Sequence, residues 1–434
     1  MRSAMTLPPL PGLRPLLPFF RSVSSSHHTP AMRLASLLII GVALAGLAST
    51  AQGEPSPPPY SQTLLIYVAK GAPNACGQGC DRWIAIEGKF DGGAAARFRR
   101  FLRGIGDAPL PFYFHSPGGD VSASLTIGRM LRARKATVRV GRTLLAACKP
   151  GAQIDEECLK IKSGREVLAE IATAGAMCNS ACVYTLLGGT TREIAPDTVL
   201  AVHNSKLTVS FRGHPTSQQR AAAVSRQWDN ANHERKAYVA AMGIDGGLLD
   251  LIQTVKFEDL HVLTRAELYR FKIDPRTAIE TAWTEVPASP PFIRKVAVVK
   301  TDDAPSFARR EWLVGCQRKD RVGLIFAREL DAKAPTTTSV ALTGGGETAP
   351  ILLAWTKRAG SSEFWSAAVA VDALTKIFAS PQLQVKETSL AEDGKSSGAS
   401  FAFDGRGFED AFVRLFASCQ TQRDSRSGAD QPKN

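Results

Sequence analysis

Long apolar runs, Gly-X-Y repeats and sustained heptads are all missing from this sequence of 434 residues. Its main apolar stretch, at 37–47, is well short of the roughly 20 residues that a membrane-spanning helix needs. These absences exclude multi-span membrane, collagen-like and coiled-coil proteins. Apolar residues make up 44% of the chain and charged residues 21%, with 36 Gly and 26 Pro. That composition is typical of a folded protein of two or three domains.

Acidic residues are missing from residues 1–53, which contain four Arg. The apolar stretch at 37–47 follows a basic residue and precedes small residues, which is the arrangement of a signal peptide cleaved after Gly53. We therefore expect residues 1–53 to be a leader and signal peptide, with the start at Met1 or Met32. The alternative is a membrane anchor, which requires that the leader is not cleaved.

The net charge of +13 comes from 53 Lys and Arg against 40 Asp and Glu. Four of those Arg belong to the expected leader, so processing leaves 49 against 40, or +9. The basic segments at 97–103 and 129–135 lack aromatic residues in a base-stacking pattern. We therefore expect no nucleic-acid partner, although the charge alone is compatible with an anionic one.

CxxC pairs with a nearby His pair are absent, although the chain contains eight Cys. All eight follow the expected leader, and an even number of Cys in an exported chain favours disulfides over a zinc site. We expect no metal and no cofactor. The disulfide candidates are Cys76, Cys80, Cys148, Cys158, Cys178, Cys182, Cys316 and Cys419.

The spacing of these Cys does not determine their connectivity. Their grouping along the chain favours three bridges: Cys76 with Cys80, Cys148 or Cys158 of an insertion with Cys178 or Cys182, and Cys316 with Cys419. Such bridges persist in an oxidising compartment. We expect the protein to be exported, to the periplasm or cell envelope of a Gram-negative bacterium.

Changes in composition divide the chain into segments. A Pro-rich linker at 54–62 follows the leader, and after the Pro-rich 287–291 the pattern changes to short strands separated by Gly, Asp and Lys turns. We expect an α/β domain at 63–286, a smaller β-rich domain at 292–425 and a disordered tail at 426–434. The β-rich domain contains no motif with chemistry.

The expected α/β domain contains a strand, a Gly-rich turn, a helix and a strand in succession. Residues 110–114 and 137–140 have the apolar pattern of buried strands, and 121–134 has an apolar stripe at helical spacing. This order predicts a right-handed parallel crossover.

Two positions combine a turn with a reactive side chain or main-chain group. The first is 116–120 (SPGGD), where Gly118 and Gly119 can point main-chain N–H groups into a cleft. The second is Ser180, which precedes a short apolar helix whose first amide belongs to Ala181. The plainer alternatives are an ordinary strand-to-helix turn and an N-cap serine.

His203 ends the apolar strand expected at 198–203, 23 positions after Ser180. A nucleophilic serine needs a base within hydrogen-bond reach, and an adjacent strand could bring His203 there. A histidine that ends a buried strand is more often structural. The imidazole would also need a carboxylate to orient it; Asp259 is the best-placed candidate and Glu258 the alternative.

Taken in order, these residues resemble the Clp protease proteolytic subunit of the ClpP/crotonase superfamily. The segment 112–119 (FYFHSPGG) is similar to its strand-and-glycine element, and 179–189 resembles its nucleophile helix. REIAPDTVLAVH at 192–203 and LTRAELY at 263–269 resemble the segments that follow. The resemblance extends over about 64–274, and exported ClpP-like proteins of bacteria match more closely than the cytosolic subunit.

The resemblance implies an α/β fold of repeated β-β-α units in a spiral. Asp259 transfers to the catalytic set less securely, because it stands four residues before Leu263 and the corresponding Asp of the family stands three before. The full set of implied roles is Ser180 as nucleophile, His203 as general base, Asp259 as third member, and the amides of Gly118 or Gly119 and of Ala181 as oxyanion hole.

The implied function is that of an exported serine peptidase acting on a peptide or protein substrate. The Cys, the export signal and the β-rich domain depart from the cytosolic subunit, so we expect no partner ATPase; a homo-oligomer is left open. One alternative is a non-catalytic ClpP-fold scaffold of the cell envelope, because Cys178 and Cys182 crowd Ser180. The other is an acyl-CoA enzyme of crotonase type, which export disfavours.

Overall fold

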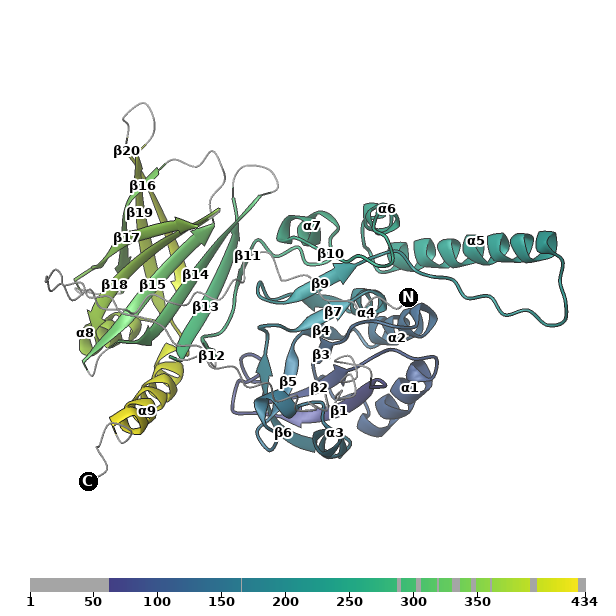
Figure 1. Cartoon of the computed structure of the whole chain (residues 1–434), viewed down its shortest axis with the longest axis horizontal. Helices are drawn as coiled ribbons and strands as arrows, with labels where there is room; N and C mark the ends of the chain where they lie inside the picture. Colours follow the sequence, from purple (N-terminus) through teal and green to yellow (C-terminus); the bar gives the residue numbers. More distant parts are fainter. Residues whose placement is uncertain are drawn as a thin grey trace, which may run out of the picture. The chain divides into compact units, whose positions relative to one another are not determined.

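A seven-stranded sheet in the order β5-β6-β1-β2-β3-β4-β8 is the framework of the first part of the chain (Figure 1). Parallel pairing joins β2 to β3, β4 and β8 in turn, and β6 to β1. The β1–β2 and β5–β6 pairs are antiparallel. The strands are β1 (Leu65–Lys70), β2 (Arg82–Glu87), β3 (Phe112–His115), β4 (Thr137–Val140), β5 (Arg142–Leu145), β6 (Glu166–Ala172) and β8 (Thr191–Glu193).

This computed structural model describes residues 62–164, 166–286, 290–301, 306–317, 320–329, 336–344, 349–359, 361–390 and 396–427. The expected leader, with Met1 and Met32, and all but one residue of the expected linker therefore lie outside the described residues. Within the described ranges, no helix has the length and apolar character needed to cross a membrane.

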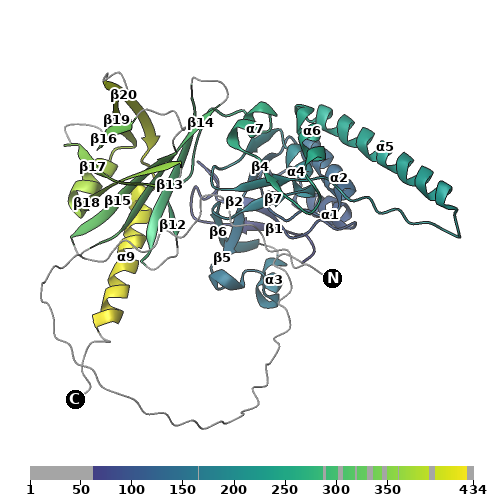
Figure 2. The ribbon, with the colours of Figure 1, turned by 45° about the horizontal axis from the view of Figure 1, so that its top comes forward.

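A second, three-stranded sheet has the order β10-β9-β7. Its strands are β7 (Met177–Asn179), β9 (Val199–Val202) and β10 (His261–Val262). The long helix α5 extends away from both sheets in the two ribbon views (Figures 1 and 2). The helices of this region are α1 (Ala94–Ile105), α2 (Val121–Ala133), α3 (Glu156–Lys162), α4 (Ala181–Leu187), α5 (Ser217–Ala241), α6 (Gly247–Thr254) and α7 (Arg265–Arg270), with a 3₁₀ turn, η1 (Pro150–Ala152).

The order of β3, α2 and β4 confirms the strand, helix and parallel strand predicted from the sequence. Helix α2 begins directly after the glycine turn because Asp120 is its N-cap: the carboxylate accepts a hydrogen bond from the N–H of Ala123 at 2.7 Å. Such a cap satisfies one of the N–H groups that the first helical turn leaves without a partner.

Apolar side chains from the helices and the large sheet form one buried cluster. It contains Phe98 of α1, Leu125 of α2 and Leu186 of α4 together with Phe112 and Phe114 of β3. Full burial of each such side chain contributes roughly 1.5–3 kcal/mol to folding. The cluster fixes α2 and α4 against the end of β3, and the glycine turn and Ser180 lie at the starts of these two helices.

The C-terminal part is a ten-stranded antiparallel sheet with its own buried cluster, which includes Trp312, Phe326 and Leu415. The order is β11-β13-β14-β15-β18-β17-β16-β19-β20, with β12 paired to β13. The elements are β11 (Ala278–Glu280), β12 (Thr284–Val286), β13 (Phe292–Lys300), β14 (Phe307–Cys316), β15 (Arg321–Glu329), β16 (Thr336–Thr343), β17 (Ile351–Ala359), β18 (Ser362–Ala370), α8 (Val371–Phe378), β19 (Gln382–Leu390), β20 (Ser396–Asp404) and α9 (Phe408–Ser427).

This sheet begins earlier in the chain than the β-rich domain expected from composition. Strands β11 and β12 lie within 278–286, which the sequence assigned to the α/β domain, yet both pair with β13. At the other end, α9 continues to Ser427, so the first two residues of the expected tail are helical. The rest of that tail lies outside the described residues.

Three disulfides are present among the described side chains: Cys76–Cys80, Cys148–Cys158 and Cys178–Cys182. The first confirms the prediction. The predicted link between the insertion and the Cys pair beside Ser180 is wrong, because each pair closes on itself, with Cα atoms 5.8 and 5.2 Å apart. Cys316 is also disulfide-bonded, and the side chain of Cys419, its predicted partner, lies outside the described residues.

The insertion at 145–164 is attached to the large sheet by a buried ion pair. Lys162 of α3 lies 2.7 Å from Glu87 of β2, and both side chains are at least 93% buried. The same carboxylate accepts hydrogen bonds from the Tyr67 hydroxyl at 2.8 Å and the Thr143 N–H at 3.0 Å. Burial raises the pKa of Tyr67, which keeps its hydroxyl protonated as a donor.

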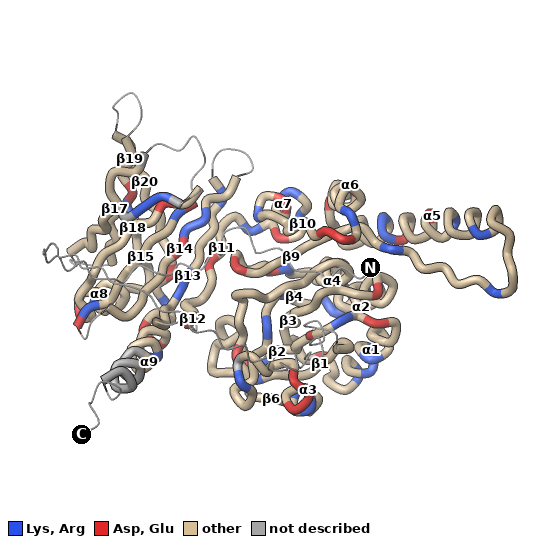
Figure 3. Tube along the Cα trace, viewed as in Figure 1, with Lys and Arg blue, Asp and Glu red and all other residues tan. Residues whose placement is uncertain are grey.

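Charged side chains of both signs are interspersed along the described chain (Figure 3). Within the two basic segments noted above, Arg97 pairs with Asp91, and Arg129 lies 3.0 Å from Glu234. Part of the charge of each segment is therefore balanced within the protein.

The buried pair predicts a large effect for Lys162→Met. The substitution leaves the carboxylate of Glu87 buried without its cation, which typically costs about 3–5 kcal/mol. Lys160→Met, on the exposed face of the same helix, is the matched control and should change the free energy of unfolding by less than about 0.5 kcal/mol. Urea unfolding measures both, and equal effects for the two variants would contradict the assignment.

Candidate active site

The parallel pairing of β7 with β9 brings Ser180 and His203 to the same edge of the small sheet. Asn179 pairs with Ala201 in register, so the residues that follow the two strands emerge side by side. The N–H of Ser180 donates to the carbonyl of Ala201 at 2.8 Å. Main-chain hydrogen bonds thus hold the serine backbone against the strand that carries the histidine.

Ser180 lies on a sharp turn between β7 and α4 with φ 54° and ψ −121°. A non-glycine residue at positive φ is strained, at a cost of about 1–3 kcal/mol, and such strain is common at active sites. A strained strand-to-helix turn that exposes a serine is the geometry of a nucleophile elbow. The side chain is partly exposed, as a nucleophile requires.

The Ser180 Oγ and the His203 Nε2 are 2.7 Å apart, which is within hydrogen-bond distance. On the other side of the ring, His203 Nδ1 lies 2.5 Å from the main-chain oxygen of Phe257. Since a carbonyl only accepts, Nδ1 carries the proton and Nε2 of the neutral ring presents its lone pair to the serine hydroxyl. The Phe257 ring also packs on the imidazole, with centroids 4.9 Å apart.

Gly118 and Gly119 pack against this elbow in conformations that exclude other residues. Their φ values are 103° and 138°. A Cβ added to Gly118 would lie 2.7 Å from the Ser180 Cβ and 3.0 Å from the Ala181 nitrogen, and one added to Gly119 would lie 2.0 Å from the Phe90 oxygen. The glycines therefore allow the turn after β3 to approach the serine closely.

Main-chain N–H groups around Ser180 are available to bind an anion. Ala181 is the first residue of α4, where N–H groups have no partner within the helix. Among the described residues, no acceptor is bonded to the N–H of Gly119 or Ala181. The N–H of Gly118 donates to the Ser116 hydroxyl at 3.1 Å. Gly119 and Ala181 are therefore the better-placed pair of donors.

The structure does not bring the two predicted carboxylates to the imidazole. Asp259 is exposed, its N–H donates to the Lys256 carbonyl, and no described hydrogen bond joins it to His203. Glu258 is exposed as well and lies 2.8 Å from Lys206. The position that an orienting carboxylate would take is occupied by the Phe257 carbonyl, which residue types alone cannot reveal.

The Cys178–Cys182 disulfide brackets the nucleophile, and both residues are fully buried. Cys178 lies in β7 and Cys182 in the first turn of α4, so the bridge joins the two sides of the turn. The bridge and the 2.7 Å contact between Ser180 and His203 are present together. The crowding inferred from the sequence therefore does not displace the serine from the histidine.

His115, at the end of β3, lies buried beside the site. Its Nδ1 accepts a hydrogen bond from the N–H of Met177 in β7 at 3.1 Å, which ties the large sheet to the small one. Burial, and next the positive charges of Arg142 and Lys162, lower the pKa of His115 to about 3. The ring is therefore neutral at neutral pH and serves as an acceptor.

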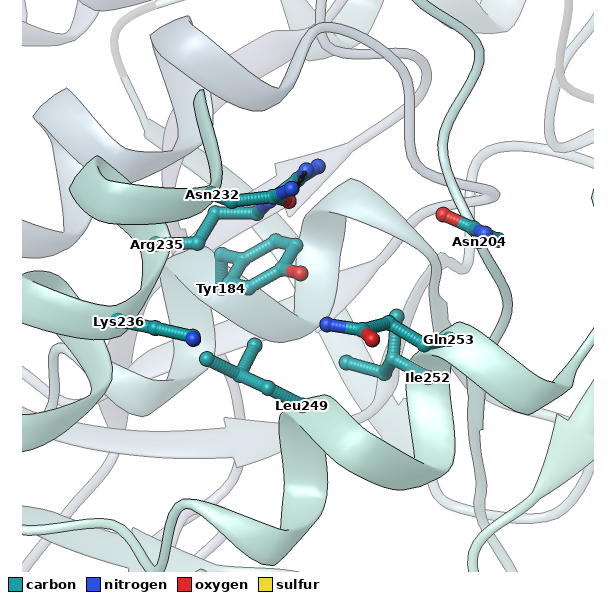
Figure 4. A pocket seen from close by; sticks show the side chains of 8 residues that line it. All are labelled: Tyr184, Asn204, Asn232, Arg235, Lys236, Leu249, Ile252 and Gln253. Atoms are coloured by element: carbon teal, nitrogen blue, oxygen red, sulfur yellow. Dashed lines mark hydrogen bonds between the residues drawn. The ribbon is translucent and has the colours of Figure 1, made fainter. Parts of the chain in front are cut away.

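A small pocket that the sequence did not suggest adjoins the site (Figure 4). Its lining comes from α4, α5, α6 and the residue after His203: Tyr184, Asn204, Asn232, Arg235, Lys236, Leu249, Ile252 and Gln253. Among the described residues there is no group of three or more His, Cys, Asp or Glu side chains that could hold a metal ion.

No protein family and no curated protein matches the chain at the sequence level. Among solved structures, invasion associated protein B from Bartonella henselae is 13% identical over 32% of this chain and 94% of its own, with a TM-score of 0.26. A ClpP1 variant from Listeria monocytogenes is 16% identical over 50% and 90%, with a TM-score of 0.26. A variant of a membrane-bound stomatin-specific protease is 15% identical over 43% and 73%, with a TM-score of 0.25. Likenesses this distant do not define a function for this chain.

The strained turn predicts that two substitutions of Ser180 differ in their free energy of unfolding. Both remove the hydroxyl, but Gly adopts φ 54° without strain and Ala does not. We expect Ser180→Gly to be more stable than Ser180→Ala by about 1 kcal/mol, although Gly usually destabilises. Urea unfolding of the two variants measures the difference, and a less stable Gly variant would show that the turn is not strained.

Buried, neutral His115 predicts a loss of stability in acid. Its pKa of about 3 in the folded state lies below the value of about 6.5 in the unfolded chain. The unfolded state therefore binds the proton first, and stability present above pH 6.5 falls by about 1.4 kcal/mol per pH unit as pH drops from 6.5 toward 3. His115→Asn, which keeps an acceptor for Met177, should show a shallower loss between pH 7 and 4.5 in urea unfolding; equal slopes would contradict the assignment.

Proposed function

We propose that this protein is a serine-type peptidase that hydrolyses peptide bonds. The observation that carries the proposal is the 2.7 Å contact between the Ser180 Oγ, on a strained and partly exposed turn, and the His203 Nε2. The oxygen of a plain N-cap serine would accept a hydrogen bond from an N–H of the first helical turn, yet the Ser180 side chain makes no such cap. Nucleophilic catalysis is the chemistry that needs this pairing.

In the proposed reaction, His203 Nε2 takes the hydroxyl proton while Ser180 Oγ attacks the carbonyl carbon of the substrate. The carbonyl oxygen becomes an oxyanion that accepts hydrogen bonds from the amides of Gly119, or Gly118, and Ala181. His203 then returns the proton to the leaving amine, and the C–N bond breaks to leave an acyl-serine. Water, activated by the same histidine, hydrolyses this ester and restores Ser180.

The main-chain oxygen of Phe257 takes the orienting role in this proposal. By accepting a hydrogen bond from Nδ1–H, it holds the imidazole in the tautomer whose Nε2 can act as a base. A neutral carbonyl stabilises the charged imidazole of the transition state less than a carboxylate does. Asp259, predicted from the resemblance as a third member, is exposed, and no described hydrogen bond joins it to the ring.

The expectations from the sequence about domain architecture, export and cofactors are part of the same proposal. We infer a ClpP-like spiral arrangement of the α/β part, export through a cleaved leader to the periplasm, and action without a cofactor, a metal or a partner ATPase. Three disulfides and the absence of a membrane-crossing helix among the described residues are compatible with export. Assembly into a homo-oligomer is left as an expectation.

Labelling with a fluorophosphonate, followed by peptide hydrolysis, tests the proposal. We expect wild-type protein with intact disulfides to be labelled, and Ser180→Ala to lose both labelling and hydrolysis. His203→Ala should lower kcat by about 10³-fold or more. If Ser180→Ala is labelled as strongly as wild type, or if wild type never reacts, the peptidase assignment fails and the scaffold alternative gains.

The Phe257 carbonyl predicts that Asp259→Asn changes kcat/KM by less than about threefold, because the carbonyl, and no described hydrogen bond from this carboxylate, holds Nδ1 of the imidazole. Glu258→Gln is the matched control on the neighbouring exposed carboxylate. A loss of about 10³-fold or more in Asp259→Asn alone would instead assign Asp259 to a catalytic triad.

A further inference from the structure

The pocket beside the site contains a buried cation that has no anion. Arg235 of α5 is 8% exposed, and among the described residues no carboxylate forms an ion pair with it or with the neighbouring Lys236. The guanidinium is held by Ser205 at 3.1 Å and by Asn232 at 2.6 Å, and it lies over the Trp228 ring. Arginine is almost never buried unless it is paired, because an uncompensated charge is costly.

A second polar group in the same pocket also lacks a partner. The Tyr184 side chain is 4% exposed, and its hydroxyl has no hydrogen-bond partner among the described residues. In Figure 4 the Tyr184 hydroxyl faces the space that Asn204 and Gln253 border. Burial raises the pKa of Tyr184, so the hydroxyl is a neutral donor. A buried donor without an acceptor costs about 1–3 kcal/mol.

The lining as a whole suits an anion of limited size. It combines two cations, the hydroxyl and three amide side chains with the apolar Leu249 and Ile252, and it contains no acidic residue. Two acids of the same region pair elsewhere: Glu234 with Arg129, and Glu258 with Lys206. The pocket is small and partly open to solvent, so it can take the end of a side chain and excludes a large ligand.

The pocket is also close to the reacting groups. Tyr184 lies four residues after Ser180, so it stands in the first turn of α4, about 6 Å along the helix from the serine. Asn204 directly follows His203, and its N–H donates to the Val255 carbonyl at 3.0 Å, just before the Phe257 turn. A substrate bonded to Ser180 can therefore reach the pocket with one side chain.

We propose that this pocket is a specificity subsite that binds the carboxylate of an acidic side chain, Glu or Asp, close to the scissile bond of the peptide substrate. The inference rests on the proposed peptidase function. The carboxylate accepts hydrogen bonds from the Tyr184 hydroxyl and the amides and is attracted by Arg235 and Lys236, which supplies the anion and the acceptor that the pocket lacks. Charge-assisted bonds of this kind give the strongest discrimination between an acid and its amide.

Matched peptides test the subsite. Internally quenched peptides with both ends blocked carry either Glu or Gln at each of the two positions on either side of the scissile bond. A further peptide has Gln at these positions and a free C-terminus, and it tests whether the pocket binds a terminal carboxylate instead of a side chain. At one position, wild type should cleave the Glu peptide with a kcat/KM at least about tenfold above the Gln peptide, as expected for one or two charge-assisted bonds.

The variants Lys236→Gln and Tyr184→Phe should each lower the ratio of Glu to Gln cleavage toward one. Lys160→Gln, which removes an exposed lysine from the distant insertion, is the matched control and should keep the wild-type ratio. Circular dichroism verifies that each variant is folded. A ratio near one at every position in wild type, or a preference for the free C-terminus alone, would overturn the side-chain subsite while leaving the peptidase function intact.

A binding measurement separates this inference from the proposed function. Fluorescence anisotropy with Ser180→Ala compares the same Glu and Gln peptides without turnover. Tighter binding of the Glu peptide, lost again with Lys236→Gln, supports the subsite even if wild type neither reacts with a fluorophosphonate nor cleaves a peptide. Equal binding of the two peptides would overturn it, whatever the result for catalysis.

Discussion

The parallel pairing of β7 with β9 is the constraint on which the candidate site depends. Parallel strands end at the same edge of a sheet, so Ser180 and His203, which follow the two paired strands, meet although they are 23 positions apart in the chain. The hydrogen bond between the Ser180 N–H and the Ala201 carbonyl then fixes the position of Ser180 along the strand that leads to His203. The glycine turn, the disulfide and the Phe257 carbonyl adjust a geometry that this pairing has already established.

Several energetically costly features lie around these strand ends. Ser180 has a positive φ, the two glycines make contacts that no side chain would allow, and the neighbouring pocket holds a buried cation without an anion and a hydroxyl without a hydrogen-bond partner among the described residues. The surrounding core and the buried Cys178–Cys182 bridge stabilise the region enough to maintain this cost. Backbone strain that a well-packed surrounding maintains is common in binding and catalytic regions.

The sequence predicted the residues whose chemistry is carried by their type. Ser180, His203 and the glycines follow apolar strands and could be recognised, and the strand, helix and strand around α2 followed from apolar spacing. The Phe257 carbonyl could not be recognised, because every residue has one. Arg235 could not either, because α5 is polar on nearly all sides and only the path of the chain brings it to Tyr184. The closure of Cys178 on Cys182 was within reach, since a sequence separation of four between a strand end and a first helical turn suits a bridge.

The main-chain acceptor on His203 gives the site an unusual pattern of mutational tolerance. Exchanging the side chain at position 257 removes the ring that packs on the imidazole but leaves the oxygen where it is, so the hydrogen bond itself does not depend on the residue type. Insertions or deletions between Val255 and Asp259 would instead move the oxygen away from the imidazole. The feature that evolution must keep in this part of the site is therefore the length of the loop from Val255 to Asp259. Relatives with the same arrangement would share the spacing between this loop and His203 more than a particular residue.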